Sequence, residues 1–260
     1  MPVDIVKSRN PFAKTIPDAV TKNSCGVCGE AKLRKHFECR SLDSGFAPLY
    51  VCVNCLCVYN ATAEFNVLDV VEWQKRWADD PEFYNVSNEE SFFQKINDSR
   101  GVFEFFQRDL ERSFSGTYTE IGAGSGIMAA AALNYFSSVN VFDHVTTRLE
   151  EVKARVGSRY NVVTVEKLKK IETDVVLIWH AMEHFLNPGG VFELCANMLR
   201  ENGLMLLQVP ILSEEHVYPG HYYFYNETTF NMLADRYKFA NVKFYYDHSM
   251  NAMTVALTKC

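Results

Sequence analysis

The chain has 260 residues, of which 48% are hydrophobic and 22% charged, and its formal net charge is −6. This length allows one ordinary α/β domain and a small module, and the balanced composition excludes a disordered or repetitive protein. Because the 26 basic residues are spread along an acidic chain, nucleic acid is disfavoured as the main partner.

The N-terminal residues 1–23 are expected to form a tail. They lack the basic flank and apolar run of a secretory signal. The longest apolar stretches, such as Met128 to Leu133, are too short to cross a bilayer. We therefore expect a cytoplasmic protein without a membrane partner, and the sequence leaves its oligomeric state open.

Half of the eight cysteines form two Cys-x2-Cys pairs, which are Cys25, Cys28, Cys52 and Cys55. In a cytosolic chain this spacing favours a metal over disulfides, because each pair can direct two thiolates at one tetrahedral zinc ion. We expect residues 24–60 to form a small zinc ribbon whose structural metal replaces a large core. Cys39 is a possible substitute ligand, and Cys57 is a more serious rival to Cys55.

Apolar residues recur at intervals of three to four between residues 61 and 115, for example at Phe92, Ile96 and Phe103. This spacing predicts amphipathic helices. We expect them to link the ribbon to a larger domain over residues 116–260 and to cap a pocket, although ordinary core packing explains most of these side chains.

The larger domain begins with a pattern of strand, glycine turn, helix and acid. A strand ending at Glu120-Ile121 precedes the turn, and a second strand over residues 139–142 ends before Asp143. The glycines of the turn, Gly122, Gly124 and Gly126, permit a sharp bend and close approach of a ligand. Asp143 lies where a carboxylate can accept hydrogen bonds from both hydroxyls of a ribose.

The spacing of these glycines distinguishes between cofactors. A dinucleotide fingerprint has its last glycine one residue later than Gly126, and its helix N-terminus receives a pyrophosphate. A sulfonium cofactor with an amino-acid end has no pyrophosphate, and the nearby carboxylate of Glu120 can orient its ammonium group. The spacing therefore disfavours a nicotinamide oxidoreductase.

Residues 120–126 resemble motif I of the class I S-adenosylmethionine-dependent methyltransferases. The resemblance continues in residues 174–188, which are similar to the family's fourth strand and its Glu-His-x-x-x-Pro signature, here Glu183, His184 and Pro188. It implies S-adenosylmethionine as cofactor. It also implies that Glu166, after a third strand at residues 161–165, contacts the adenine. Trp179 ends the fourth strand, and because open α/β sheets bind ligands beyond the carboxyl ends of their strands, we expect it at the cofactor site, near the methyl group that is transferred.

The resemblance covers residues 117–257 and includes a closing hairpin. A fifth strand over residues 203–209 and a helix over residues 227–236 precede two runs, 242–246 and 252–257, that predict the hairpin. We therefore expect an α/β fold with a Rossmann-like, seven-stranded, mostly parallel sheet closed by an antiparallel hairpin, and a small N-terminal zinc ribbon.

His221 lies in a segment, residues 218–225, that is similar to the His-Glu-His-x-x-Tyr-Phe segment of deoxysugar C-methyltransferases. Those enzymes also carry a Cys-x2-Cys zinc module in front, and the resemblance implies that His221 is the base that deprotonates the acceptor. Pro219-Gly220 stands where those enzymes have the leading His-Glu.

A second interpretation concerns His180, Glu183 and His184, which at i, i+3 and i+4 would share one face of a helical turn. With His221 they offer ligands to a divalent ion, in a pattern that resembles the Glu-x-x-Glu-His metal site of ubiquinone-pathway O-methyltransferases and RNA 3′-terminal ribose methyltransferases. This resemblance implies Mg or Mn. In the alternative, the Glu183-His184 pair only braces its loop through hydrogen bonds.

We expect a methyltransferase that acts on a small molecule, either a sugar, a sugar nucleotide or a natural-product intermediate. A histidine would assist deprotonation of the acceptor before in-line methyl transfer. An RNA or protein methyltransferase that binds its substrate through the zinc ribbon is one alternative, and a non-catalytic scaffold that keeps the cofactor fold is another.

Overall fold

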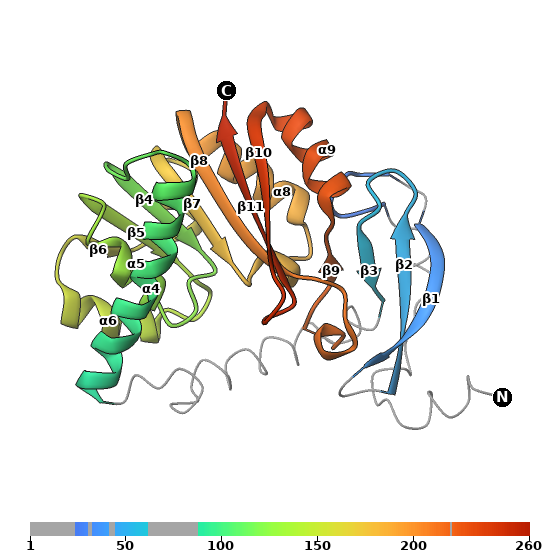
Figure 1. Ribbon diagram of the computed structural model, residues 1–260, viewed down its shortest axis with the longest axis horizontal. Helices are drawn as coiled ribbons and strands as arrows, with labels where there is room; N and C mark the ends of the chain where they lie inside the picture. The colour runs from blue at the N-terminus through green and yellow to red at the C-terminus, as the bar shows by residue number, and fades with distance from the viewer. Residues whose placement is uncertain (1–23, 31–32, 42–44, 62–87, 219) are drawn as a thin grey trace. The chain divides into compact units, whose positions relative to one another are not determined.

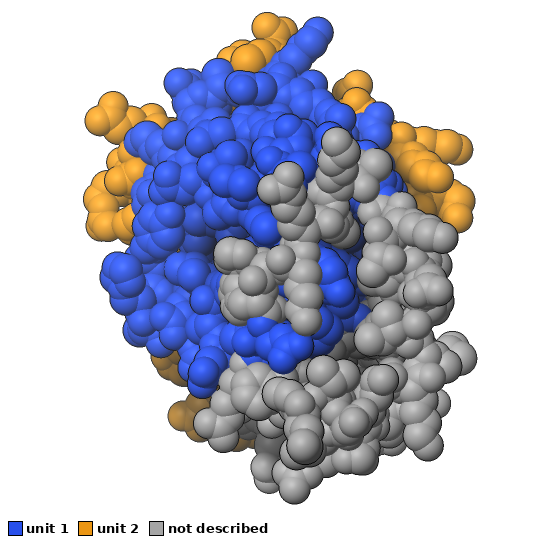
Figure 2. All heavy atoms as spheres, turned by 90° about the vertical axis from the view of Figure 1, so that its right-hand side faces the viewer, with its two compact units in different colours: residues 1–71, 180–194, 207–257 blue, residues 72–179, 195–206, 258–260 orange. Residues whose placement is uncertain are grey.

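The computed structural model describes residues 24–30, 33–41, 45–61, 88–218 and 220–260. The expected N-terminal tail and residues 62–87 of the expected helical linker lie outside the described residues. The chain divides into two compact units, which Figure 2 shows in different colours. Unit 1 contains Met1–Val71, His180–Leu194 and Leu207–Leu257, and unit 2 contains Glu72–Trp179, Cys195–Leu206 and Thr258–Cys260.

A seven-stranded sheet has the order β10-β11-β8-β7-β4-β5-β6 (Figure 1). Its strands are β4 (Thr117–Ile121), β5 (Ser138–Phe142), β6 (Tyr160–Val162), β7 (Thr173–Trp179), β8 (Leu199–Pro210), β10 (Phe239–Asp247) and β11 (Ala252–Lys259). Strand β4 pairs in parallel with both β5 and β7, and β5 pairs in parallel with β6. The hydrogen-bonded neighbours β10 and β11 form the closing hairpin, so the expected Rossmann-like sheet is confirmed.

The central strands form because they are nearly continuous apolar runs, which suits strands that are covered on both faces. Residues 175–178 of β7 and 203–210 of β8 are all buried. In unit 2, aromatic side chains pack together beside β4, with the Phe103 ring 5.8 Å from that of Tyr118 and the Phe114 ring 5.5 Å from that of Phe136. These contacts hold β4, and the glycine turn after it, in a rigid setting.

The helices of the described residues are α4 (Glu89–Asp109), α5 (Ile127–Ala132), α6 (Thr147–Val156), α7 (Val165–Leu168), α8 (Pro188–Met198) and α9 (Glu227–Tyr237), with 3-10 turns η3 (Met182–His184) and η4 (Glu214–His216). The expected cap of α8 is present, because the Asn187 side chain accepts a hydrogen bond from the N–H of Gly190 at 3.0 Å. None of the helices in this part of the chain has the length and apolar character needed to span a bilayer.

A second, four-stranded sheet in unit 1 has the order β1-β2-β3-β9 (Figure 1). It joins β1 (Leu33–Ser41), β2 (Gly45–Cys52) and β3 (Val58–Asn60) to the distant β9 (Tyr223–Phe224), and all of its pairs are antiparallel. Ala47 and Leu49 share a buried cluster with Val217 and Phe224. The N-terminal module therefore shares both its sheet and its core with the segment that carries His221.

The expected third strand ends earlier than predicted. Strand β6 stops at Val162, and Val165 already begins α7, because the side chain of Thr164 accepts a hydrogen bond from Lys167 N and caps that helix. Glu166 consequently lies in the first turn of a short helix and is exposed.

Candidate active site and metal centre

The turn after β4 in unit 2 requires glycine at each of its three glycine positions. Gly122, Gly124 and Gly126 have φ angles of 74°, 51° and 73°, in the left-handed region that side chains disfavour. A Cβ on Gly126 would also lie 2.2 Å from the hydroxyl of Tyr160. The three glycines therefore produce a tight turn without side chains at these positions, as close approach of a cofactor needs.

Asp143 is tied to this turn by hydrogen bonds. Its Oδ2 accepts from Gly124 N at 2.9 Å, and its Oδ1 accepts from Val145 N at 3.0 Å and lies 3.0 Å from Nδ1 of His144. Burial by itself would raise the pKa of Asp143, but the contacts with His144, Val145 and Gly124 outweigh it and hold the pKa below the ordinary value. The carboxylate is thus ionised and can accept hydroxyl donors.

Glu120 has a different electrostatic state. Its side chain is buried, and its Oε2 accepts a hydrogen bond from the Tyr118 hydroxyl at 2.8 Å. Burial raises the pKa of Glu120 to about 8, although the Tyr118 hydrogen bond opposes that rise. At neutral pH this carboxyl group is therefore largely protonated in the protein without ligand.

The other two residues that were predicted to bind the cofactor make no hydrogen bond to the group around Asp143. Glu166 is exposed on α7 and is not part of the hydrogen-bonded group around Asp143. Trp179 is partly buried at the carboxyl end of β7, the edge at which open α/β sheets bind ligands.

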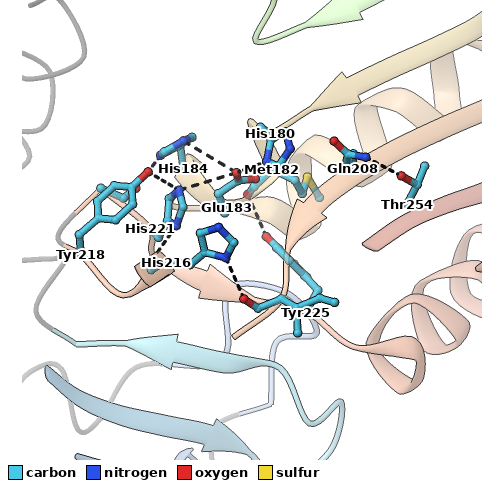
Figure 3. Close-up of polar contacts among 12 residues, drawn as sticks. His180, Met182, Glu183, His184, Gln208, His216, Tyr218, His221, Tyr225 and Thr254 are labelled. Atoms are coloured by element: carbon cyan, nitrogen blue, oxygen red, sulfur yellow. Dashed lines mark hydrogen bonds and ion pairs between the residues drawn. The ribbon is translucent and has the colours of Figure 1, made fainter. Parts of the chain in front are cut away.

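In unit 1 the chain brings all four predicted acceptor-site residues around one carboxylate (Figure 3). Glu183 is fully buried, and neither of its carboxylate oxygens has a hydrogen-bond partner among the described residues. Its Oε1 lies 3.7 Å from Nδ1 of His180, 4.0 Å from Nε2 of His184 and 3.8 Å from Nε2 of His221.

The expectation that His180, Glu183 and His184 share one helical face is wrong. His180 has a left-handed φ of 48° and only residues 182–184 form a 3-10 turn, so His180 reaches Glu183 from outside the helical turn. The N–H of His180 donates to the carbonyl of Gln208 at 2.9 Å, which holds this conformation. The N–H of Tyr222 donates to the carbonyl of Glu183 at 2.8 Å and brings in the segment with His221.

Backbone carbonyls orient two of the imidazoles. Nδ1 of His184 lies 2.6 Å from Gly220 O, and Nδ1 of His221 lies 2.8 Å from His216 O, so each Nδ1 carries the hydrogen and donates it. The Nε2 atoms are left as acceptors. Burial lowers the pKa of His221 to about 3, so at neutral pH the imidazole is uncharged and its Nε2 is an acceptor.

Sequence reasoning missed Tyr218 and Gln208. The Tyr218 hydroxyl donates to Nε2 of His221 at 2.5 Å, and the i, i+3 spacing within an aromatic segment was a signal that could have found it. Gln208 is buried on β8 beside His180, and no pattern in the sequence distinguishes it.

The four predicted zinc ligands form a second group in unit 1. Cys25, Cys28, Cys52 and Cys55 are buried, and their sulfur atoms all lie within 4.8 Å of one another. Sγ of Cys25 is 3.7 Å from that of Cys55, and Sγ of Cys28 is 3.5 Å from that of Cys52. Tetrahedral zinc with bonds of about 2.3 Å needs sulfur atoms about 3.8 Å apart, so the group fits.

Cys57, the rival ligand, is directed elsewhere. Its thiol donates to the carbonyl of Phe224 in β9 at 3.2 Å, and it is not part of the four-sulfur group. The cysteine group is tied to the first turns of α8 and α9. Gly189 N donates to Gly26 O at 3.0 Å, and Thr229 Oγ1 donates to Cys55 O at 2.9 Å.

Known proteins share this fold. A family model described as a methyltransferase domain matches residues 97–243, while a search of curated proteins gives no match. The N-methyltransferase NodS from Bradyrhizobium japonicum, solved with S-adenosylhomocysteine, is 10% identical with a TM-score of 0.55, over 73% of this chain and 98% of that chain.

Two further solved structures are similar. An S-adenosylmethionine-dependent methyltransferase from Clostridium acetobutylicum is 9% identical over 73% of this chain and 98% of its own, with a TM-score of 0.51. The CurJ carbon methyltransferase is 13% identical over 77% of this chain, with a TM-score of 0.53, and the match spans 64% of its length. Because the family model covers more than half of the 260 residues, the chain belongs to the methyltransferase domain family.

Proposed function

We propose that the glycine turn of unit 2 holds S-adenosylmethionine and that Asp143 binds the hydroxyls of its ribose. The ionised carboxylate of Asp143, hydrogen-bonded to the turn itself, is the observation that supports this assignment. Gly122, Gly124 and Gly126 would let the cofactor approach the backbone. Glu166 and Trp179 are the outer contacts of the same proposal.

Calorimetry with S-adenosylhomocysteine tests this assignment. Asp143→Asn should weaken binding by about 10-fold to 100-fold, because a hydrogen bond to a charged group contributes about 1.5–3 kcal/mol. Asp247→Asn is the matched control, since Asp247 also accepts two backbone N–H groups but lies at the end of β10. Unchanged affinity in Asp143→Asn would exclude this cofactor role.

We further propose that the acceptor is a small molecule, of the sugar, sugar nucleotide or natural-product class, and that His221 is its base. When bound, the cofactor supplies an electrophilic methyl group on a sulfonium centre. His221 takes the acceptor's proton at Nε2, where the acceptor replaces the Tyr218 hydroxyl as hydrogen-bond donor. The acceptor's electron pair forms the bond to the methyl carbon, and the carbon–sulfur bond breaks. The Glu183 carboxylate, 3.8 Å from Nε2, balances the charge on the imidazolium.

Formation of S-adenosylhomocysteine with a panel of sugars and sugar nucleotides tests the role of His221. His221→Ala should slow turnover about 100-fold or more, the usual contribution of a general base, and should leave cofactor affinity nearly unchanged. His248→Ala, on the exposed turn after β10, is the control and should keep the full rate. An unaffected rate in His221→Ala would refute the assignment.

We propose a structural zinc site on the basis of the four-cysteine group. We also propose residues 24–60 as the ribbon, residues 61–115 as a helical linker or cap, and residues 116–260 as the methyltransferase domain. Four thiolates leave no open coordination position, so this zinc would stabilise the fold and not take part in transfer. Metal analysis of protein purified without chelator should give one equivalent of zinc, and less than about half would remove the assignment.

A second candidate at the His–Glu cluster is a divalent ion held by Glu183, His184 and His221. Their ligand atoms lie within 4.8 Å of one another, and His180 is close to the same oxygen. Two imidazoles and one carboxylate suit Mn²⁺ better than Mg²⁺, which prefers oxygen ligands. Loss of activity in chelator and its restoration by Mn²⁺ would support this candidate, and full activity in chelator would end it.

A macromolecular acceptor is the alternative substrate class. Salt-dependent binding of RNA, or methylation of a protein, would favour an enzyme that uses its cysteine module to bind the substrate. A protein that binds S-adenosylhomocysteine but transfers no methyl group to any acceptor would be a scaffold.

A further inference from the structure

Three neighbouring side chains in unit 1 present buried acceptor atoms without a hydrogen-bond partner among the described residues. These atoms are Oε1 and Oε2 of Glu183, Nε2 of His180 and Oε1 of Gln208. A buried polar atom without a partner costs about 1–3 kcal/mol, so native proteins hold few of them and each needs an explanation.

The three residues are neighbours in the fold. His180 Nδ1 lies 3.7 Å from Oε1 of Glu183, and the backbone N–H of His180 donates to the carbonyl of Gln208 at 2.9 Å. Figure 3 shows His180 between the other two side chains. Gln208 is held in place by Thr254, whose Oγ1 accepts from the Gln208 amide nitrogen at 2.9 Å, and only 5% of Gln208 is exposed.

The atoms of this group that lack a hydrogen-bond partner are all acceptors. The amide nitrogen of Gln208 donates to Thr254, and the amide oxygen is left without a donor. His180 directs Nδ1 at the carboxylate, which favours the hydrogen on that nitrogen and leaves Nε2 as an acceptor. A ligand that satisfies the group must therefore bring several hydrogen-bond donors.

A buried carboxylate also requires a compensating positive charge or a proton. His184 and His221 donate their Nδ1 hydrogens to backbone carbonyls, so their uncharged forms carry no hydrogen on the Nε2 atoms that lie 4.0 and 3.8 Å from Oε1 of Glu183. A primary ammonium group supplies both a positive charge and three N–H donors.

We propose that Glu183, His180 and Gln208 form a subsite for a primary ammonium group on the methyl acceptor, so that the substrate is an amine-bearing small molecule. This inference rests on the proposed function and narrows its substrate class. Gln208 is then a specificity residue that no sequence pattern indicated. Its oxygen accepts one of the three N–H groups of the ammonium, and the carboxylate of Glu183 favours the charged ammonium over a hydroxyl or a methyl group.

The test uses a pair of small probes, ethanolamine and ethylene glycol, with the full-length protein in chelator and saturating S-adenosylhomocysteine. NMR titration of the imidazole C–H signals measures both affinities. Wild type should prefer ethanolamine by about 10-fold or more, which corresponds to about 1.4 kcal/mol. Gln208→Met, which keeps the volume and loses the acceptor, should reduce that preference, because the three N–H donors of ammonium need more acceptors than one hydroxyl does. Gln208→Glu should keep it.

Gln94→Met is the matched control, because the amide of Gln94 also donates to a side-chain oxygen, that of Asp98, on the exposed face of α4. It should keep the preference for ethanolamine. Equal affinity for the two probes in wild type, or an undiminished preference in Gln208→Met, would overturn the inference.

The source of the ammonium group is tested separately by calorimetry. If Gln208→Met weakens S-adenosylhomocysteine but not 5′-methylthioadenosine, which lacks the amino-acid end, the subsite serves the cofactor and the inference is overturned. Failure of wild type to bind S-adenosylhomocysteine at all would instead remove the proposed function, so the two failures are distinguishable.

Discussion

The protonation state of Glu120 makes the stability of the protein depend on pH in a defined direction. Burial, partly opposed by the Tyr118 hydrogen bond, raises the pKa of Glu120 from its ordinary 4.5 to about 8. Between these values the folded protein holds a proton that the unfolded chain releases. The resulting stability is fully present below pH 4.5 and is lost as the pH rises through 8.

The size of this effect follows from the two pKa values. At about 1.4 kcal/mol per pH unit, the interval from 4.5 to about 8 amounts to about 5 kcal/mol. The His221 imidazole, whose pKa burial lowers from 6.5 to about 3, acts in the opposite direction below pH 6.5. The contribution of Glu120 must therefore be isolated by comparison with a variant.

Glu120→Gln is the appropriate variant, because its amide oxygen can still accept the Tyr118 hydrogen bond while the group no longer titrates. Urea unfolding at pH 5, 6, 7 and 8, followed by tryptophan fluorescence, gives both free energies of unfolding. Wild type should lose about 1.4 kcal/mol per pH unit relative to the variant. Parallel pH profiles for the two proteins would refute the reasoning, since they would show that Glu120 is already ionised in the fold.

The carboxyl group of Glu120 also couples cofactor binding to the release of a proton. If the ammonium group of the cofactor contacts Glu120, binding at pH 7 should lower its pKa and release most of one proton. Calorimetry in two buffers of different ionisation enthalpy measures that proton. Release of an equal amount by Glu120→Gln would assign the proton to another group.

Two further predictions concern packing and metal binding. Gly189→Ala should lower the melting temperature and the zinc content, because its Cβ would lie 2.5 Å from the carbonyl oxygen of Val27 in the first cysteine loop. The control Gly101→Ala, in an open position of α4, should stabilise the protein by about 1 kcal/mol. A stable, fully loaded Gly189→Ala would contradict this packing. Cys55→Ser should lose the metal, whereas Cys57→Ser should keep it, and metal analysis that gave the reverse would make Cys57 the ligand.

Where sequence interpretation was wrong, a local detail changed the path of the chain. The third strand ends at Val162 because Thr164 caps a helical turn. The left-handed φ angle of His180 keeps this residue out of the helical turn that contains Glu183 and His184. Capping and one reversed φ angle act at single residues, which patterns averaged over many residues do not resolve.

The sequence by itself determined the central strands, the glycine turn with Asp143 and the grouping of the four cysteines. Each of these is a local demand: an apolar period, a φ angle that only glycine adopts readily, or a spacing that suits one tetrahedral ion. Only the tertiary structure decided which distant residues meet. It paired β3 with β9, gathered three histidines around Glu183 and placed Gln208 beside them. It also raised the pKa of Glu120, because burial depends on what packs around a carboxyl group and not on the residues beside it in the chain.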